Sequence, residues 1–563
     1  MPFRRILRKK WLPWFAVAVL FLGAPAAWWA WHRHPAGDTY DIVVVGAGPG
    51  GVAASLQAAR MGRHVALLEP TDWIGGQMAA AGVGTMDEGS PAARKSGIYA
   101  EFVQRANALY AAQGKSAGTC YYSLDTLCVD PRDGRAILQQ MLDGAPDNLN
   151  VFTATPVTAV TKTGNRVTGV DAGGRHFSSK VVIDADEYGD VLALAGATYR
   201  LGNTTSAQPA ATPPCVQDIT YVAVMKQYPH GVPANLTFSA PPPGYNAAVA
   251  AHFATYLKQN GYALQVKPAA RKASNRLPMA FAAYSAYRGY PDSSPGSPSY
   301  DALQQNGHAI ARTSLNLGND YPLQGALSSK YITDPAYRAQ AGCQAKLLTL
   351  QLAYYIQHDL GQTDWSIAND EGYATPYATQ HRCASLKGYD AFQDNMAQEP
   401  YVREGRRLIG TETLTGNALV QSWNDKKALT AYADGIAVGY YSMDLHQCAA
   451  AGTLESAFDA PVDVARGGPF EVPLGTLVPQ TMDGLVAAEK NISASRLANG
   501  AIREQPIAMD TGQAAGALAA LAVQKRTQPR LVPAADVQAA LHAAGGVTSL
   551  KSLGYSVHYG GAT

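Results

Sequence analysis

The sequence lacks several patterns that would point to common kinds of site. Its six cysteines include no CxxC pair, which excludes a dithiol redox motif and leaves no cysteine spacing suited to zinc. Its twelve histidines form no HExxH-type cluster. Charge of neither sign predominates, since the net charge is +2, and this argues against nucleic acid as a partner. What remains is the composition of a large globular protein of 563 residues, long enough for two or more domains.

Ionisable side chains are also absent from Trp11–Trp31, a stretch long enough to span a bilayer. Five basic residues precede it within the first ten positions and would stay in the cytoplasm. We therefore expect an uncleaved membrane anchor, with the body of the protein outside the cytoplasm, in the periplasm. A cleaved signal is the alternative, because Ala24–Ala26 offers small residues and Arg4–Lys9 resembles a twin-arginine export signal. Both alternatives place the body outside the cytoplasm.

The even number of cysteines fits an oxidising compartment. They are Cys120, Cys128, Cys215, Cys343, Cys383 and Cys448. Cys120 and Cys128 form the most favourable local pair for a disulfide. Buried free thiols are the alternative.

A glycine-rich turn near the start of the chain organises the rest of the sequence. The β-branched run Asp41–Val45 leads into Gly46, Gly48, Pro49, Gly50 and Gly51, and then into a helical pattern that ends at Arg60. In this arrangement the first glycine permits a tight turn, the second lets the backbone approach a pyrophosphate, and the last allows close packing of helix on strand. The free N–H groups of the helix N-terminus would face the phosphates. The spacing therefore predicts a dinucleotide-binding unit.

A second strand at His64–Leu68 ends in Glu69, about 20 residues after the turn. An acid at this place can accept hydrogen bonds from a ribose diol. The alternative is an ordinary βαβ unit in which Glu69 is merely solvated.

Elements further along the chain can be placed by periodicity. Residues 151–184 alternate as short strands with Gly-Asn and Gly-Gly turns, which indicates a β-meander. Helices are expected near Tyr99–Ala112, Arg135–Leu142, Ala247–Gln259 and Gln344–Asp359. Loops are expected over Gly202–Gly244. A late buried strand at Leu485–Ala488 should precede a helix that opens at Thr511 and ends at Gln524.

The body of the chain, roughly Tyr40–Val523, resembles the FAD-dependent oxidoreductases of the glutathione-reductase structural type. More closely, it resembles a bacterial FAD-dependent oxidoreductase family described as xanthan-lyase-related. The stretches that carry the resemblance are Gly46–Glu69, Trp73–Gln77, Val182–Ala185, Tyr401–Glu404 and Gly484–Gly516.

The resemblance implies an α/β fold with a discontinuous, Rossmann-like FAD-binding domain and an inserted α+β substrate domain. The expected divisions are 1–37 (basic N-terminus, hydrophobic segment and linker), 38–201 (FAD-binding domain, first part), 202–470 (substrate or cap domain), 471–526 (FAD-binding domain, second part) and 527–563 (C-terminal extension). The chain departs from the family pattern at Asp186-Glu187, where Thr-Gly is usual, and at Glu489-Lys490, where Gly-Arg or Gly-Lys is usual. It also lacks the histidine that is common near Ser495. We expect the contacts nearest the flavin to differ accordingly.

FAD is the expected cofactor. The residues expected to bind it are Gly46, Gly48, Pro49, Gly50, Gly51, Glu69, Gly75, Gly76, Gln77, Val157, Gly512, Gln513, Ala514 and Ala515. A helix N-terminus at Gly512–Ala515 would place N–H groups at the flavin edge where negative charge accumulates on reduction. Close helix packing through small residues is the alternative. A second strand-linked GxGxxG is missing, so NADPH is not expected as the electron donor.

The expected reaction is the oxidation of a small molecule by a dehydrogenase or oxidase, with hydride transfer to flavin N5. A quinone, another carrier or O2 would then reoxidise the flavin. If the stretch around Arg403, Arg406 and Arg407 is helical, these guanidinium groups share a face and could hold a substrate carboxylate. His446 could remove a hydroxyl proton as the hydride leaves. Structural ion pairs for the arginines, and a structural role for His446, are the alternatives.

Two other functions stay open at this point. One is an FAD-binding electron-transfer or assembly subunit that needs a partner for its substrate. The other is a non-catalytic protein that keeps the fold and has lost the flavin. No metal site is expected.

Overall fold

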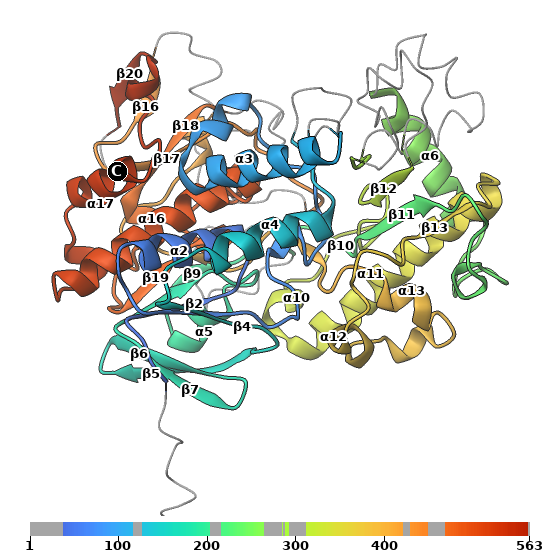
Figure 1. Ribbon diagram of the computed structural model, residues 1–563, viewed down its shortest axis with the longest axis horizontal. Coiled ribbons are helices and arrows are strands. Elements are labelled where there is room, and N and C mark those ends of the chain that lie inside the picture. Colours follow the sequence, from blue (N-terminus) through green and yellow to red (C-terminus); the bar gives the residue numbers. More distant parts are fainter. Residues whose placement is uncertain are drawn as a thin grey trace, which may run out of the picture.

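The computed structural model describes residues 38–115, 117, 127–202, 215–263, 284, 288–291, 311–419, 428–448 and 468–560 (Figure 1). The predicted anchor or signal within residues 1–37 lies outside these ranges. Within them, no helix is both long enough and apolar enough to cross a bilayer.

A five-stranded parallel sheet forms the centre of one half of the molecule (Figure 1). In spatial order its strands are β19 (Leu485–Ala487), β8 (Val181–Asp184), β2 (Ile42–Val45), β3 (Val65–Leu68) and β4 (Leu149–Phe152). All residues of β2, β3, β8 and β19 are buried, as is usual for short apolar strands covered on both faces. The late strand predicted at Leu485–Ala488 is confirmed, and it pairs with β8. Residues from both ends of the chain therefore build one sheet, as in a Rossmann-like fold.

The helix α2 (Pro49–Arg60) connects β2 to β3 and packs along α16 (Gln505–Gln524). A side chain at Gly512 or Gly516 would overlap the carbonyl oxygens of Gly50 and Ala54 on α2. The prediction that this late helix opens at Thr511 is wrong. It begins at Gln505, because proline in the first turn is compatible with a helix start and the apolar pattern continues from there.

Three more helices pack around this pair. They are α3 (Gly97–Ala112), α4 (Pro131–Asp143) and α17 (Ala534–Ala543). α3 contacts both α4 and α16, and α17 contacts α16. The two predicted early helices are confirmed, although α4 begins at Pro131, where Asp130 caps it by accepting from the Arg132 N–H.

The predicted β-meander is confirmed. It consists of β5 (Val157–Thr163), β6 (Arg166–Ala172) and β7 (Arg175–Ser178), which pair in antiparallel order. β1 (Asp38–Thr39) adds to its edge in parallel. The short helix α5 (Asp190–Ala195) contacts β5.

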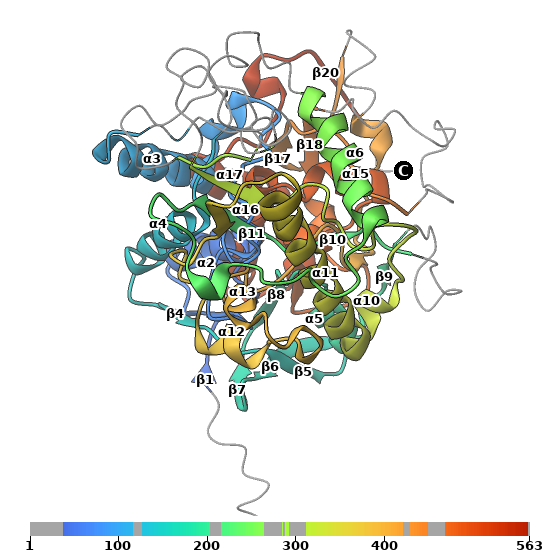
Figure 2. The same cartoon turned by 90° about the vertical axis from the view of Figure 1, so that its right-hand side faces the viewer.

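The other half of the molecule faces the viewer in Figure 2. It has a separate hydrophobic core and a small antiparallel sheet, whose strands are labelled in Figure 1. The sheet order is β12 (Arg312–Leu315), β11 (Ala223–Gln227) and β13 (Trp365–Ile367). Its two long helices are α6 (Ala247–Ala263) and α11 (Pro335–Tyr354), the latter continued by a π-helical turn at Tyr355–Asp359. Both helices were predicted, although α11 begins at Pro335 and not at Gln344. The expectation of loops over Gly202–Gly244 is wrong at β10 (Ile219–Thr220) and β11. The domain boundaries within this arrangement stay a prediction.

The remaining elements are short. The strands are β9 (Tyr199–Arg200), β14 (Tyr401–Val402), β15 (Arg407–Leu408), β16 (Leu429–Ala431), β17 (Gly435–Gly439), β18 (Phe470–Pro473) and β20 (Val557–Tyr559). The helices are α10 (Lys330–Thr333), α12 (Pro376–Gln380), α13 (Asp390–Asp394) and α15 (Arg496–Ile502). The 3₁₀ turns are η1 (Gly76–Met78), η2 (Pro91–Lys95), η3 (Ala234–Leu236), η5 (Ala384–Leu386), η6 (Leu474–Leu477), η7 (Glu489–Asn491), η8 (Pro529–Leu531) and η9 (Lys551–Leu553).

The expectation of disulfides is confirmed. Cys215 bonds to Cys448, and Cys343 bonds to Cys383. Cys128 is also disulfide-bonded, while its predicted partner Cys120 lies outside the described residues. None of the five cysteines in the described ranges is a free thiol.

Candidate functional site

The glycine turn after β2 has the geometry that its spacing predicted. Gly46 adopts φ +92°, and a side chain there would overlap Ala185 on the neighbouring strand-end loop. A side chain at Gly51 would overlap the Gly46 carbonyl. These two positions therefore require glycine for the turn itself and for the packing of α2 on the sheet.

The loop after β3 closes against this turn. The Gly75 N–H donates to the Ala47 carbonyl at 2.7 Å, and Gly76 lies beside the Cα of Gly48. The Gln77 side chain instead extends toward the end of α15 (Arg496–Ile502), where its Nε2 donates to the Arg503 carbonyl at 2.8 Å. The structure thus brings Gly75 and Gly76 to the turn, whereas the Gln77 side chain bonds elsewhere.

Glu69 lies beneath the turn and is almost completely buried. One carboxylate oxygen accepts from the Ala47 N–H at 2.9 Å, and the other accepts from the Thr71 N–H and hydroxyl at 2.9 and 2.8 Å. Burial raises its pKa to about 7 in spite of these hydrogen bonds. Glu69 holds the loop closed, and its predicted bond to a ribose stays a prediction.

A cavity of about 550 Å³ begins at the turn. Its lining includes Gly46, Gly48, Glu69, Gly76 and Val157, so the structure brings these predicted residues to one space. The far wall carries several tyrosines and cations, among them Tyr221, Tyr331, Tyr377, Arg338 and Lys346. This volume and mixed lining suit an organic ligand.

Two glutamates not predicted to bind cofactor also lie at the turn. The Gly50 N–H, in the first turn of α2, donates to Glu489 Oε1 at 2.7 Å. That oxygen lies 2.6 Å from the position that a Gly48 side chain would take. Glu187 also approaches Gly48, and its carboxylate pairs with Lys490. The departures from the family pattern thus lie at the glycine turn, although we expected them nearest the flavin.

Glu489 adopts φ +53°, in the left-handed region that favours glycine. A residue other than glycine in such a sparsely populated conformation costs on the order of 1–3 kcal/mol. Burial, together with the nearby Glu187 charge, raises the pKa of Glu489 to about 7, and Lys490 opposes this rise.

The site fits a dinucleotide only in part. The glycine turn, the helix N-terminus and the adjoining cavity fit. The position next to Gly48 and Gly50 is where a diphosphate would accept hydrogen bonds from free N–H groups. It does not fit a diphosphate while the Glu489 carboxylate accepts from the Gly50 N–H.

The predicted contacts from Gly512 to Ala515 are contradicted in one respect. These residues lie inside α16, so their N–H groups belong to helical hydrogen bonds and do not form a helix N-terminus. Gly512 packs on the backbone of α2, and Gln513 links α3 to α2 by accepting from the Ile98 N–H and donating to Gln57. The alternative, close packing through small residues, describes this segment.

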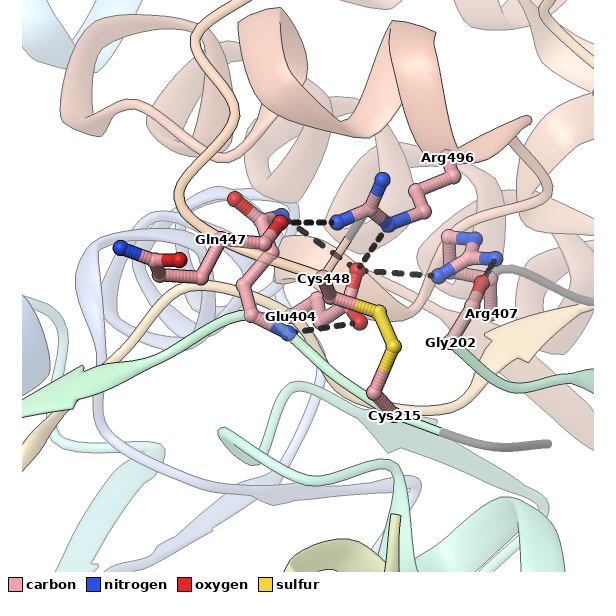
Figure 3. Close-up of a disulfide and its surroundings, with 8 residues drawn as sticks. Gly202, Cys215, Glu404, Arg407, Gln447, Cys448 and Arg496 are labelled. Atoms are coloured by element: carbon pink, nitrogen blue, oxygen red, sulfur yellow. Dashed lines mark hydrogen bonds and ion pairs between the residues drawn. A yellow bond between two sulfur atoms is a disulfide. The ribbon is translucent and has the colours of Figure 1, made fainter. Parts of the chain in front are cut away.

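The arginine-rich stretch is not a helix, so its guanidinium groups do not share one face. It runs from β14 to β15, and successive side chains diverge. Arg406 pairs with Asp190. Arg407 is fully buried, pairs with Glu404 at 3.6 Å and donates to the Gly202 carbonyl at 2.7 Å, which Figure 3 shows. The prediction that Arg407 joins Arg403 on one face is therefore wrong.

Arg403 and His446, by contrast, converge on the same two carboxylates. Arg403 donates to Asp218 at 3.1 Å and to Asp320 at 3.0 Å. His446 Nδ1 lies 3.7 Å from Asp218 and 3.9 Å from Asp320, and its Nε2 lies 3.1 Å from Asp444. We call Asp218, Asp320, Arg403, Asp444 and His446 the histidine cluster. Because Arg403 already holds two acids, it is placed to position them and not to grip a substrate carboxylate.

The carboxyl groups of the histidine cluster differ in their proton affinity. Burial and the Asp320 charge raise the pKa of Asp218 to about 6. Burial disfavours ionised Asp320, but Arg403 and His446 outweigh it and lower its pKa. At Asp444 the hydrogen bond from His446 and the charge of Arg503 likewise outweigh burial and hold the pKa well below its usual range.

A second cavity, of about 220 Å³, adjoins the histidine cluster. Asp218, Asp320 and His446 form part of its wall, together with His252 and Tyr256. None of its lining residues also lines the larger cavity within the described part of the chain.

Arg503 connects the two regions. Its backbone carbonyl accepts from Gln77 beside the glycine turn, and its guanidinium donates to Asp444 at 2.7 Å. It also pairs with Glu504 at 2.7 Å and contacts the Tyr401 hydroxyl. Arg503, Asp218 and Asp320 were not predicted as site residues. Asp444 lies two positions before His446, in an Asp-x-His pattern that the family resemblance includes, although no role was predicted for it.

Comparison with known families finds one match across most of the chain. The model of a family described as FAD dependent oxidoreductase matches residues 41–541. Comparison with curated proteins finds no match.

Comparison with solved structures finds partial matches to flavoenzymes among others. The p-nitrophenol 4-monooxygenase PnpA of Pseudomonas putida is 15% identical over 34% of this chain and 48% of its own, with a TM-score of 0.23. The myxobacterial chondrochloren halogenase CndH is 18% identical over 35% of this chain and 46% of its own, with a TM-score of 0.23. The L-proline dehydrogenase of P. horikoshii is 18% identical over 26% of this chain and 22% of its own, with a TM-score of 0.17. The matched segment thus spans less than half the length of each of these neighbours.

Proposed function

Because the chain belongs to the FAD-dependent oxidoreductase family, we propose that it is a dehydrogenase or oxidase whose substrate reacts beside His446. The protein is an FAD-dependent oxidoreductase, and FAD is its cofactor. When bound, FAD accepts the electron pair that leaves the substrate. The closer relation to xanthan-lyase-related proteins is part of the proposal.

The observation that carries this proposal is the setting of His446. Its Nε2 lies at hydrogen-bonding distance from Asp444, which is itself fixed by Arg503. When Nε2 donates to Asp444, the lone pair is on Nδ1, and the ring forms part of the wall of the smaller cavity. A carboxylate that orients a histidine in this way is a common feature of acid–base catalysis.

The surrounding acids suit a histidine that gains a proton. Asp218 and Asp320 lie within 4 Å of Nδ1, so they would stabilise the imidazolium that forms when Nδ1 takes a hydroxyl or amine proton. Arg403 keeps both acids in place and balances part of their charge. In this proposal His446 is the base, and Arg403 and Asp444 are positioning residues.

The proposal includes a location outside the cytoplasm. The basic N-terminus and the uncharged stretch that follows support export, and so do the disulfides Cys215–Cys448 and Cys343–Cys383. A membrane anchor would favour a quinone or another carrier as electron acceptor. The redox state of these cysteines in intact cells tests the location.

The first experiment is an anaerobic screen of alcohols, sugars, amines and carboxylates that follows bleaching of the bound flavin. Bleaching by one class without any added protein supports a dehydrogenase or oxidase. Bleaching that needs a second protein would favour an electron-transfer subunit instead. A purified protein that cannot be loaded with flavin would favour the non-catalytic alternative.

The second experiment uses the substrate found in that screen. His446→Gln should lower the rate of flavin reduction by about 100-fold or more, since a positioned base typically contributes that much. FAD content and thermal unfolding should be unchanged. The matched control is His252→Gln in the same cavity, whose Nε2 lies 3.3 Å from the Gly318 carbonyl. A wild-type rate and pH profile in His446→Gln would refute the assignment of the base.

A further inference from the structure

The glycine turn already contains an anion. Glu489 Oε1 accepts from the Gly50 N–H at 2.7 Å and fills the space left by the missing side chain of Gly48. An N–H group at the start of a helix that points into such a space is where a phosphate oxygen is normally held. The carboxylate and a phosphate cannot both occupy it.

Glu489 is held in this place by the fold. The residue is fully buried on η7, immediately after β19, and it keeps a backbone conformation that favours glycine. Its second oxygen, Oε2, has no hydrogen-bond partner among the described residues. A buried carboxylate aimed at the turn with one unsatisfied oxygen is poorly stabilised. The interaction with Gly50 is therefore one that a stronger anion could replace.

The charges around the turn oppose a diphosphate. Glu187 faces Gly48 from the loop after β8, and Lys490 on η7 pairs with it. Glu399, which precedes β14, and Glu69 at the end of β3 also act electrostatically on this group of acids. Four carboxyl groups thus face one ammonium group, before two phosphates are added.

We propose that Glu489 is an internal competitor for the FAD diphosphate. Its carboxylate caps the N-terminus of α2, and FAD binds only when that carboxylate leaves the Gly50 N–H. This proposal rests on the family assignment of FAD as cofactor and is independent of the role given to His446. It implies that flavin binding is weaker and more readily reversed than the glycine turn alone would permit.

The test measures binding of FAD, ADP and riboflavin to flavin-depleted protein by calorimetry. ADP carries the diphosphate without the flavin, and riboflavin carries the flavin without a phosphate. Glu489→Gly should tighten FAD and ADP by at least about tenfold, because it removes both the competing group and one like charge. Riboflavin affinity should stay unchanged.

Two further variants separate competition from damage to the fold. Glu489→Gln keeps an acceptor for Gly50 but loses the charge, so it should tighten FAD and ADP by less than Glu489→Gly. Glu412→Gln is the matched control, since Glu412 is a partly buried carboxyl that faces Asp434 and Gly475, and it should leave all three affinities unchanged. Each variant is checked by circular dichroism and thermal unfolding.

Unchanged or weaker FAD and ADP binding in both folded Glu489 variants would overturn the proposal. Such a result would leave the reaction at His446 standing, because no turnover is measured. Conversely, loss of the His446 assignment would not alter the expected binding data.

Discussion

At the scale of single residues, the charge of the glycine turn is set by buried acids whose pKa values are raised. Burial raises the pKa values of Glu69 and Glu489 to about 7 each, so both change charge near neutral pH. Burial and the charges of Glu69 and Glu187 also raise the pKa of Glu399 well above its ordinary value. Lys490 is the cation among them, and Glu187, Glu489 and Glu399 hold its pKa high although burial opposes this. The charge of the turn therefore depends on pH.

This dependence predicts how FAD affinity changes with pH. A neutral Glu489 repels phosphate less and binds the Gly50 N–H less strongly than the ionised form, so FAD binds best below pH 7. The apparent Kd should rise by about tenfold or more from pH 6 to pH 8, since one ionised group then opposes binding. Titrations of flavin-depleted protein at several pH values provide the measurement.

Glu489→Gly is the matched variant for this prediction. It should retain only the smaller dependence that Glu69 imposes. An equally steep rise in Kd in wild type and variant would show that Glu489 is not the group responsible.

At the scale of elements, the contact between α2 and α16 determines where the first turn of α2 lies. Gly512 on α16 contacts the backbone of Gly50, whose N–H is the donor at the anion position. Small residues on α16 let the two helices approach closely. The same residues that were predicted to touch the flavin therefore act on the cofactor site through helix packing.

We predict that Gly512→Val lowers both stability and FAD affinity. The added side chain would meet the Gly50 carbonyl and force the helices apart, which typically costs about 1–3 kcal/mol of unfolding free energy. Chemical denaturation and FAD titration measure the two effects. Gln524→Val, at the exposed end of the same helix, is the control and should change the unfolding free energy by less than about 0.5 kcal/mol. Normal stability and FAD affinity in Gly512→Val would contradict this account of the packing.

The sequence allowed the elements near the glycine turn to be predicted, because their signals are local. The spacing from Gly46 to Gly51 and the apolar runs of β2 and β3 define the βαβ unit without distant contacts. Periodicity failed where strands are very short, as at β10 and β14, since two residues show no alternation. It also misplaced the start of α16, where Pro506 marks a first helical turn.

The histidine cluster was only half predictable for a related reason. Asp218, Asp320 and His446 lie more than 100 positions apart in the chain, so no local pattern joins them. Arg403 was identified from the spacing of three nearby arginines and His446 from its residue type, with support for both from the family resemblance. Glu489 was recognised as a departure from the family, but its contact with Gly50 depends on the pairing of β19 with β8.

At the scale of the whole molecule, the disulfide Cys215–Cys448 (Figure 3) joins two of the segments that contribute to the histidine cluster. Cys215 lies three positions before Asp218, and Cys448 lies two positions after His446. Arg496 donates to the Gln447 carbonyl at 3.0 Å and forms a buried ion pair with Glu404 at 3.6 Å. These contacts also fix the loop that contains His446 and Cys448. Two segments separated by 233 positions are thereby held together covalently.

We predict that the double variant Cys215→Ser/Cys448→Ser is less stable and reduces its flavin more slowly with substrate. Loss of a native disulfide typically costs about 2–4 kcal/mol. The control is Cys343→Ser/Cys383→Ser. It removes the disulfide that packs in the hydrophobic core around β11, so it should destabilise the protein without the same loss of the rate of flavin reduction. Equal rates in the two folded double variants would contradict a role for Cys215–Cys448 in holding the cluster.

Thiol labelling in intact, rapidly quenched cells extends this experiment to the location of the protein. An exported body should offer no alkylatable thiol at Cys215, Cys343, Cys383 or Cys448. A variant without residues 1–31 should offer all four. Free thiols in the full chain would refute the proposed location.

The disulfide Cys215–Cys448 also bears on when the histidine cluster is completed during synthesis and export. Asp218 is synthesised long before His446, and under the proposed export the bond that fixes their spacing would form only after both segments have met in an oxidising space. Newly made copies that are still on the cytoplasmic side would therefore hold an unfinished acid–base centre. Formation of this disulfide would therefore confine substrate oxidation to the proposed compartment outside the cytoplasm, and no separate inhibitor would be needed.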